Sequence, residues 1–379
     1  MSKHTTDVAV IGAGIIGASC ADQLSQRGLR VTVVESLEAA AMGSTGKSAA
    51  GVRVQFTTET NIRMSRLSLP IYRDFLEVHG IDVGYQPIGY LLLVPPDRWE
   101  AHQESVALQR SLGVPVELLS PEEATRYVEM EVDGLAGATF GPMDGVVDPH
   151  SAAHAYVQLS RRRGVEYRFD CPVRAITRVG GCWRLELPDG SLEAHHVVNA
   201  AGAWSGRVAS MAGLELPVRP MRCMIFLTSP VEDPRTYPLT IDIESGFYLR
   251  SEGNRVLFGL TNENEAFGFV EGMNWDWLDE TLVSGLPRFP WLEEVGLDRG
   301  GCWWGYYEVT PDHNPVIGRH PDAENWVDAT GFSGHGIMHA PATGLLVAEI
   351  IQDGQSRTIS TEAFRHGRFG EGGGDANIF

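Results

Sequence analysis

Three closely spaced glycines directly after a short apolar run constrain the fold of this chain more than any other feature. Val8–Ile11 predicts a buried strand, and it is followed by Gly12-Ala13-Gly14-Ile15-Ile16-Gly17. This G-x-G-x-x-G pattern is typical of a strand–turn–helix unit. In such a unit Gly12 allows the tight turn, Gly14 lets the backbone approach a pyrophosphate, and Gly17 lets helix and strand pack closely.

The residues that follow complete a β-α-β unit. Ala18–Arg27 predicts a helix that ends at Gly28. Val31–Val34 predicts a second buried strand, which leads to Glu35. A carboxylate there accepts hydrogen bonds from ribose hydroxyls, and the N-terminus of the helix offers free N–H groups to phosphates. The unit therefore predicts a dinucleotide site, but it does not decide between FAD and NAD.

Length and composition place this unit in a larger globular protein. A chain of 379 residues, 43% hydrophobic and 21% charged, favours two ordinary globular domains. Its formal net charge of −19 disfavours nucleic acid or an anionic membrane as a partner. The scattered cysteines form no C-x-x-C pair, so we expect no metal site and favour reduced thiols in a cytoplasmic protein. Because no apolar run reaches about 20 residues, we expect no membrane span.

Later loops rich in small residues could complete a site for a long cofactor. They are Gly43–Ser48, the end of the expected strand Val197–Ala200, and Gly331–Gly336, which joins a strand to a helix that begins near Met338. The N-terminus of that helix would face negative charge on a reduced ring. A site assembled from both ends of the chain favours FAD, since NAD needs only the first unit.

The middle of the chain has a different pattern. Residues 217–305 are rich in aromatic and β-branched residues, which predicts antiparallel sheet with short helices. We expect residues 1–85, 141–216 and 305–379 to form an FAD-binding domain. Residues 86–140 and 217–304 would then form a substrate domain. The predicted fold class is α/β (α+β overall), a Rossmann-type FAD-binding domain with an inserted antiparallel-sheet substrate domain.

At the level of whole motifs, the chain resembles the D-amino-acid oxidase superfamily of flavoproteins, within it the glycine/sarcosine oxidase and proline dehydrogenase β-subunit branch. Besides the N-terminal glycine motif, the resemblance is carried by Ser44–Arg53, Asn199–Trp204, Thr310–Gly318 and Gly331–Gly336. These motifs extend from residue 7 to about residue 350, whereas 86–140 and 217–304 match only loosely. The resemblance implies that the substrate lies between two domains, on the face of the flavin.

Motifs and resemblance together predict the residues that hold FAD. They are Gly12, Gly14, Ile15, Ile16, Gly17, Glu35, Ser36, Ser44, Thr45, Lys47, Ser48, Ala49, Gly51, Val52, Val173, Ala200, Ala201, Gly202, Trp204, Gly305, Gly334, His335, Gly336, Ile337 and Met338. Some relatives tether the flavin through a cysteine where this chain has Gly305, and Cys302 lies earlier. Others tether a second flavin to a histidine where this chain has Pro149. We therefore expect one non-covalent FAD.

The usual anchors of a substrate carboxylate are replaced in this chain. The arginine that binds the carboxylate in some relatives aligns with Tyr307, and the lysine that does so in others aligns with Met338. Arg53, Arg222 and Arg250 are the candidate replacements. The lysine that helps oxygen react in sarcosine oxidases aligns with Leu257, which leaves oxidase versus dehydrogenase open.

Five side chains are the candidate catalytic residues. They are Arg53, Tyr248, Tyr307, His335 and His339. Four of them have an alternative structural role: a salt bridge for Arg53, a place in the aromatic core for the two tyrosines, and a helix cap for His339.

The resemblance implies a flavin-dependent oxidation in which hydride passes from the carbon next to nitrogen to the flavin. Water then hydrolyses the imine. We expect the substrate to be a small secondary amine or amino acid, such as an N-substituted glycine or an imino acid, and the electrons to reach O2, which gives H2O2. One alternative is a dehydrogenase subunit that passes electrons to a partner subunit, and another is a non-catalytic FAD-binding assembly protein.

Overall fold

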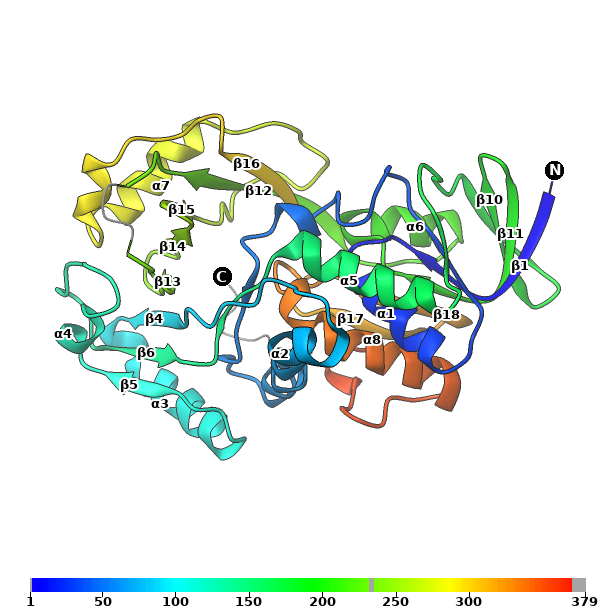
Figure 1. Cartoon of the computed structure of the whole chain (residues 1–379), viewed down its shortest axis with the longest axis horizontal. Helices are drawn as coiled ribbons and strands as arrows, with labels where there is room; N and C mark the ends of the chain where they lie inside the picture. Colours follow the sequence, from blue (N-terminus) through cyan, green and yellow to red (C-terminus); the bar gives the residue numbers. More distant parts are fainter. Residues whose placement is uncertain (1, 232–234, 370–379) are drawn as a thin grey trace.

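The computed structural model describes residues 2–231 and 235–369. Figure 1 shows an elongated molecule with one sheet and its helices at the right and a second sheet at the left. Residues 370–379, which we expected to belong to the FAD-binding domain, lie outside the described residues.

The first sheet contains the predicted β-α-β unit. Its strands follow the order β17-β18-β11-β1-β2-β8, and β10 and β9 extend it beside β11. The central neighbours are parallel. The bounds of its strands are Ser2–Ile11 (β1), Val31–Val34 (β2), Glu166–Arg168 (β8), Ala175–Val179 (β9), Cys182–Leu187 (β10), Gly190–Asn199 (β11), Val316–His320 (β17) and Ala323–Thr330 (β18).

One expected strand is the end of a longer one. We expected Val197–Ala200 as a separate strand, but β11 runs without a break from Gly190 to Asn199. Its first half alternates between buried and less buried residues and pairs with β10, whereas its last residues are all buried between β1 and β18. The apolar pattern changes because the strand passes from the rim of the sheet to its centre.

Helices cover this sheet and each other. α1 packs against α5 and α8, and α8 packs against α2. Gly344 of α8 lies close to Ser19 on α1, whose hydroxyl donates to the carbonyl oxygen of Ala340 at 2.8 Å. The bounds of the helices are Ile15–Gln26 (α1), Glu59–His79 (α2), Pro96–Ser111 (α3), Pro121–Ala124 (α4), Pro149–Arg162 (α5), Ser205–Met211 (α6), Asp276–Gly285 (α7) and Gly336–Asp353 (α8).

The second sheet combines the two chain segments that we assigned to the substrate domain. Its order is β16-β12-β15-β14-β13-β4-β6-β5. The bounds are Tyr90–Val94 (β4), Glu117–Leu119 (β5), Gly137–Gly141 (β6), Arg219–Leu227 (β12), Leu239–Asp242 (β13), Tyr248–Glu252 (β14), Arg255–Gly259 (β15) and Trp303–Val309 (β16). One face packs under α7 through a cluster that includes Phe226, Phe247 and Phe258.

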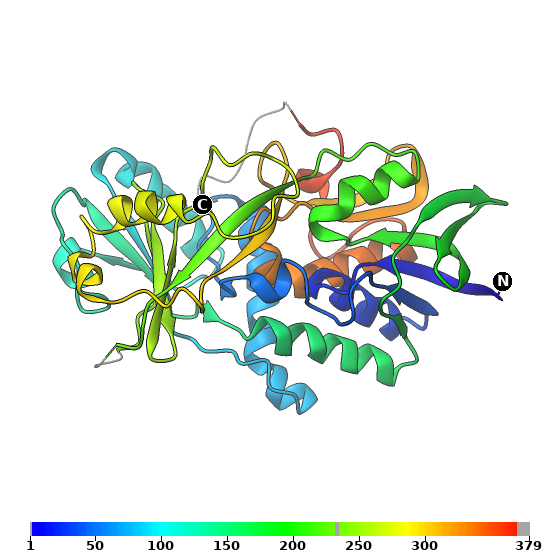
Figure 2. The ribbon, with the colours of Figure 1, turned by 90° about the horizontal axis from the view of Figure 1, so that it is seen from above.

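Two details of this sheet differ from the expectation. The sheet is antiparallel except where β13 pairs with β4 in parallel, with Leu239 beside Tyr90. That junction joins strands from distant parts of the chain, so no hairpin dictates its direction. In addition, β16 carries the sheet to Val309, beyond the boundary that we expected at residue 304. Figure 2 shows long strands that run from this sheet toward the centre of the molecule.

A short two-stranded ribbon and the C-terminal segment complete the described chain. The ribbon pairs β3 (Gly51–Val52) with β7 (Gly145–Val146). Arg368 donates to the carboxylate of Asp312 at 2.8 Å and to the carbonyl oxygen of Asn314 at 2.7 Å, which fastens the last described residues to the turn after β16. Over the described residues, no helix is both long and apolar enough to span a bilayer.

Candidate active site

A cavity of about 540 Å³ is lined by residues from both sheets and from both ends of the chain. Its walls include the glycine turn after β1, the loop 43–51, the end of β11, and the start of α8. Strands β12, β13 and β16 contribute the opposite wall. The first turns of α1 and α8 both border it, so two helix N-termini face the same space.

The glycine turn leaves no room for β-carbons at two of its positions. Gly12 has φ +104°, and a β-carbon there would overlap the carbonyl oxygen of Ala200. A β-carbon on Gly17 would overlap the carbonyl oxygen of Gly12. At Gly14 the nearest atom is the hydroxyl oxygen of Thr45, 3.1 Å from the added carbon. Gly14 borders the cavity, and Gly17 acts in packing behind it.

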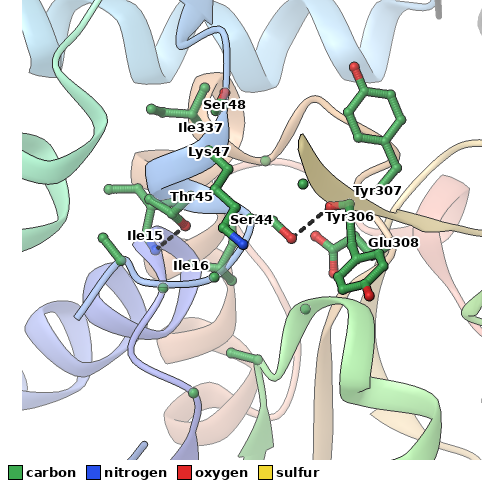
Figure 3. Close-up of a pocket in the computed structure, with 18 of the residues that line it drawn as sticks. Ile15, Ile16, Ser44, Thr45, Lys47, Ser48, Tyr306, Tyr307, Glu308 and Ile337 are labelled. Atoms are coloured by element: carbon green, nitrogen blue, oxygen red, sulfur yellow. Dashed lines mark hydrogen bonds between the residues drawn. The ribbon is translucent and has the colours of Figure 1, made fainter. Parts of the chain in front are cut away.

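The loop 43–51 is fastened to both α1 and β16. The Ile15 N–H donates to the hydroxyl oxygen of Thr45 at 3.1 Å, and the Ser44 hydroxyl donates to the carbonyl oxygen of Tyr306 at 2.7 Å, as Figure 3 shows. The Trp303 indole donates to the carbonyl oxygen of Lys47 at 2.9 Å. The hydroxyls and backbone of this loop therefore stand at the N-terminus of α1, where phosphate groups bind.

Glu35 lies at the end of β2, as the sequence predicts. Its carboxylate accepts the Ala13 N–H at 2.7 Å and the Leu37 N–H at 2.9 Å, and it borders the cavity beside Ser36 and Val173. The carboxylate thus fixes the turn and still faces the space where a ribose would lie.

Most of the predicted cofactor residues line this one cavity. They are Gly12, Gly14, Ile15, Ile16, Glu35, Ser36, Ser44, Thr45, Lys47, Ser48, Ala49, Gly51, Val173, Ala200, Ala201, Gly202, Trp204, Gly305, Gly334, His335, Gly336, Ile337 and Met338. Gly17 and Val52 are buried behind the lining residues.

Arg53 is buried beside the cavity, with 2% of its surface exposed. Its guanidinium carbon lies 4.7 Å from the ring centroid of Phe56 and 5.8 Å from that of Tyr90. Its Nη2 lies 3.4 Å from Nε2 of His335, and Nδ1 of His335 lies 3.2 Å from the carbonyl oxygen of Phe332. Since only an N–H can face that carbonyl, Nδ1 carries the proton and Nε2 accepts from Arg53.

A buried carboxylate holds the backbone next to Arg53. Asp144 accepts the Val54 N–H at 2.9 Å and the side-chain amide of Gln55 at 3.1 Å. Burial raises the pKa of Asp144 to about 7, while these hydrogen bonds and the charge of Arg53 act in the opposite direction. Asp144 supports Arg53 from behind, because it does not line the cavity.

The other two candidate arginines point elsewhere. Arg222 forms a 2.7 Å ion pair with Glu265. Arg250 forms a 2.6 Å ion pair with Glu252 and donates to the carbonyl oxygen of Ala49 at 3.0 Å. Neither lines the cavity, which leaves Arg53 as the candidate that does.

Four tyrosines line the cavity, and three of them (Tyr90, Tyr248 and Tyr307) pack over a glycine. The ring of Tyr307 would be 2.9 Å from a β-carbon on Gly334. The Tyr248 hydroxyl occupies the place of a β-carbon on Gly259, and the Tyr90 hydroxyl that of one on Gly51. Burial raises the pKa of each phenol, so all three stay neutral hydrogen-bond donors.

His339 does not reach the cavity. Its Nε2 lies 3.0 Å from the hydroxyl oxygen of Ser65 on α2, and its ring packs 5.2 Å from that of Phe56. It therefore belongs to the contact between α2 and α8, whereas its neighbour Met338 lines the cavity.

Sequence reasoning missed several lining residues, among them Tyr90, Cys223 and Glu308, whose side chains carry polar groups. Tyr90 and Cys223 come from strands of the loosely matching segments, and Cys223 pairs with Gly305 across β12 and β16. Glu308, which Figure 3 labels below Tyr306, accepts the Thr330 hydroxyl at 2.7 Å, and burial raises the pKa of its carboxyl group. Only strand pairing brings these groups to the cavity, although the Thr-Pro-Asp motif just after Glu308 is a signal in the sequence.

A separate group of possible metal ligands lies near the C-terminal segment. It consists of His320, Asp328 and His366, with His366 Nε2 3.0 Å from the carboxylate of Asp328. Nε2 of His320 lies 3.0 Å from the carbonyl oxygen of Glu215, and Nδ1 accepts the Asp322 N–H at 3.2 Å. Because both nitrogens of His320 have backbone partners, we assign no metal ion to this group.

The glycine turn, the helix N-termini and Glu35 define a Rossmann-type dinucleotide-binding protein, and these residues fit FAD. The family model described as FAD dependent oxidoreductase (DAO) matches residues 7–350. The chain belongs to this family, which confirms the resemblance, the predicted fold class and the predicted cofactor.

Several relatives are similar over most of the chain. It is 32% identical to FAD-dependent oxidoreductase domain-containing protein 1 of Xenopus laevis, over 97% of this chain and 83% of the relative. The L-proline dehydrogenase structure from P. horikoshii has a TM-score of 0.91 and 29% identity, over 98% of this chain and 100% of that one. Mitochondrial dimethylglycine dehydrogenase of Rattus norvegicus is 28% identical over 93% of this chain, which spans only 44% of that protein.

Proposed function

We propose that this protein oxidises the carbon–nitrogen bond of a small amino acid whose nitrogen is secondary, such as an imino acid or an N-substituted glycine. The observation that carries the proposal is the buried guanidinium of Arg53, which borders a cavity suited to a flavin. A fixed cation in such a place matches a substrate carboxylate, since guanidinium and carboxylate form strong paired hydrogen bonds. The similarity to a proline and a dimethylglycine dehydrogenase supports the same substrate class.

The residues of this chain would hold the substrate and tune its protonation. Arg53 binds the carboxylate and thereby orients the α-carbon. The neighbouring apolar side chains of Ile225, Leu239 and Ile241 disfavour an ammonium ion, so they favour the neutral amine that can react.

Bound FAD supplies the acceptor for the hydride that leaves the carbon next to nitrogen. The nitrogen lone pair then forms the carbon–nitrogen double bond, and water cleaves the imine to a carbonyl compound and an amine. We propose O2 as the electron acceptor, which gives H2O2. A protein acceptor is the second candidate, and the similarity to two dehydrogenases favours it. We also propose a cytoplasmic location, supported by five free cysteines.

The first experiment follows the absorbance of the flavin without oxygen. L-Proline, sarcosine, iminodiacetate, glycine and D-amino acids are each added to the yellow protein, and air is then admitted. Bleaching by a secondary amine supports the proposal, and recovery in air with H2O2 identifies an oxidase. Bleaching without recovery identifies a dehydrogenase. A flavin that none of these amines bleaches contradicts the proposal and favours a non-catalytic FAD-binding protein.

The role of Arg53 has its own test. Arg53→Ala should lower kcat/KM by roughly 10²-fold or more, since a buried ion pair with the carboxylate is lost. The exposed Arg63, paired with Glu59, offers the control variant Arg63→Ala, which should retain wild-type kinetics. Wild-type kinetics in Arg53→Ala with normal FAD content would show that Arg53 does not bind substrate.

A further inference from the structure

Tyr90 is the first residue of β4, and it borders the cavity from the second sheet. Only 4% of its surface is exposed. The parallel pairing of β4 with β13 places it beside Leu239, which also lines the cavity. Its hydroxyl lies over Gly51, another lining residue, so the polar end of the side chain is at the cavity.

Within residues 2–231 and 235–369, the structure gives the Tyr90 hydroxyl no hydrogen-bond partner. Two other tyrosines near the cavity, Tyr306 and Tyr72, differ in this respect. The hydroxyl of Tyr306 donates to the carbonyl oxygen of Val270 at 3.1 Å, and that of Tyr72 donates to the carbonyl oxygen of Ile337 at 2.7 Å. Because none of the described residues accepts from this hydroxyl at the cavity wall, a bound ligand can serve as its partner there.

The neighbours of Tyr90 indicate the charge of that partner. The guanidinium of Arg53 lies 5.8 Å from the Tyr90 ring centroid. Burial raises the pKa of the phenol and outweighs the opposite influence of Arg53, so the hydroxyl remains a donor. A cation and a neutral donor side by side match an anion with more than one acceptor oxygen.

The rest of this part of the cavity has few polar groups. Leu239 and Ile241 of β13 line it and pack in one apolar cluster with Tyr90. An amino acid would therefore place its carboxylate between Arg53 and Tyr90 and its apolar substituent against β13. The two donors come from different parts of the fold, because Arg53 directly follows β3 and Tyr90 begins β4.

We propose that Tyr90 is a substrate-binding residue whose hydroxyl donates a hydrogen bond to the carboxylate that Arg53 binds. This inference rests on the proposed function, because it requires a substrate with a carboxylate. It also assigns the apolar side chains of β13 to recognition of the substituent on the substrate.

The test uses Tyr90→Phe in the FAD-loaded protein and two probes that lack an oxidisable C–H bond. Pyrrole-2-carboxylate carries the anion, and pyrrole-2-carboxamide is its neutral counterpart. Dissociation constants are measured from the change that each probe causes in the visible spectrum of the flavin. We expect Tyr90→Phe to raise the dissociation constant of the carboxylate probe by about 10-fold to 100-fold. It should raise that of the amide probe by less than about 3-fold.

A control variant and a double variant test whether the effect is specific to the Tyr90 hydroxyl. Tyr127→Phe removes an exposed hydroxyl near Glu117, outside the cavity lining, and should bind both probes like the wild type. If Arg53 and Tyr90 hold the same group, the effects of Arg53→Gln and Tyr90→Phe on carboxylate binding should not add in the double variant.

The outcomes separate this inference from the proposed function. If Tyr90→Phe binds the carboxylate probe as tightly as the wild-type protein does, Tyr90 has no role in binding it. The proposed function is untouched by that result, because the wild-type protein still binds the probe. Equal weakening of both probes would also overturn the role of Tyr90, since that result indicates a change of shape. If the wild-type protein binds neither probe and no amine bleaches its flavin, the proposed function itself fails.

Discussion

The glycine turn permits a prediction in which two neighbouring substitutions have different effects. Gly12→Ala would place a methyl group into the carbonyl oxygen of Ala200 and would hold alanine at φ +104°. The backbone strain costs roughly 1–2 kcal/mol, and the overlap costs roughly 1–3 kcal/mol more. We therefore expect roughly 2–5 kcal/mol of lost stability in the FAD-free protein, and a melting temperature lower by roughly 5 °C or more.

Gly14→Ala is the matched variant two residues away. Gly14 has φ −68° and ψ 179°, which alanine adopts without strain, and its added carbon meets only the Thr45 hydroxyl at 3.1 Å. The same carbon would stand where the backbone must approach a pyrophosphate. We expect an FAD-free melting temperature within about 2 °C of the wild type, but a dissociation constant for FAD raised by about 10-fold or more.

Both quantities are measured on protein from which FAD has been removed. Thermal unfolding reports stability, and titration with FAD, followed by quenching of tryptophan fluorescence, reports affinity. An unchanged melting temperature in Gly12→Ala would refute the close contact between this turn and Ala200, the residue after β11. Wild-type FAD affinity in Gly14→Ala would refute the approach of the pyrophosphate to this residue.

Two further predictions concern stability. His102 is buried with Nε2 3.0 Å from the Thr139 hydroxyl oxygen, and burial lowers its pKa to about 4. Between pH 6.5 and pH 4 the unfolded chain therefore binds a proton that the folded protein does not. The free energy of unfolding should fall by at most about 3 kcal/mol as the pH is lowered through this range. Urea unfolding should show a smaller fall in His102→Gln, and an equal fall would contradict this assignment. Gly344→Ala brings a methyl group within 2.6 Å of the Ser19 carbonyl oxygen, so thermal unfolding should show a loss of about 1–3 kcal/mol, whereas no loss would mean that α1 and α8 are farther apart.

The parts of the site that follow from local chemistry could be predicted from the sequence. The turn at Gly12 needs a residue that tolerates positive φ, and Glu35 follows a strand of the same unit. The loops 43–51 and 331–336 contain small residues, and loops at the ends of parallel strands meet at the same edge of the sheet.

The remaining parts depend on contacts between distant segments. Nothing local dictates that β4 runs parallel to β13, so the position of Tyr90 beside Leu239 could not be foreseen. The same holds for Glu308, whose partner Thr330 comes from another strand. His339 and Met338 are neighbours on α8, and the rotation of that helix against α2 decides which of them faces the cavity.

The tyrosines that rest on glycines affect how this pocket can change during evolution. Tyr307 lies over Gly334, Tyr248 over Gly259, and Tyr90 over Gly51. A side chain at any of these glycines would displace the ring above it, while a smaller residue in place of the tyrosine would leave a hollow above a bare backbone. New substrate preferences should therefore arise through paired replacements, and a library that varies each glycine together with its tyrosine would sample shapes that single substitutions miss.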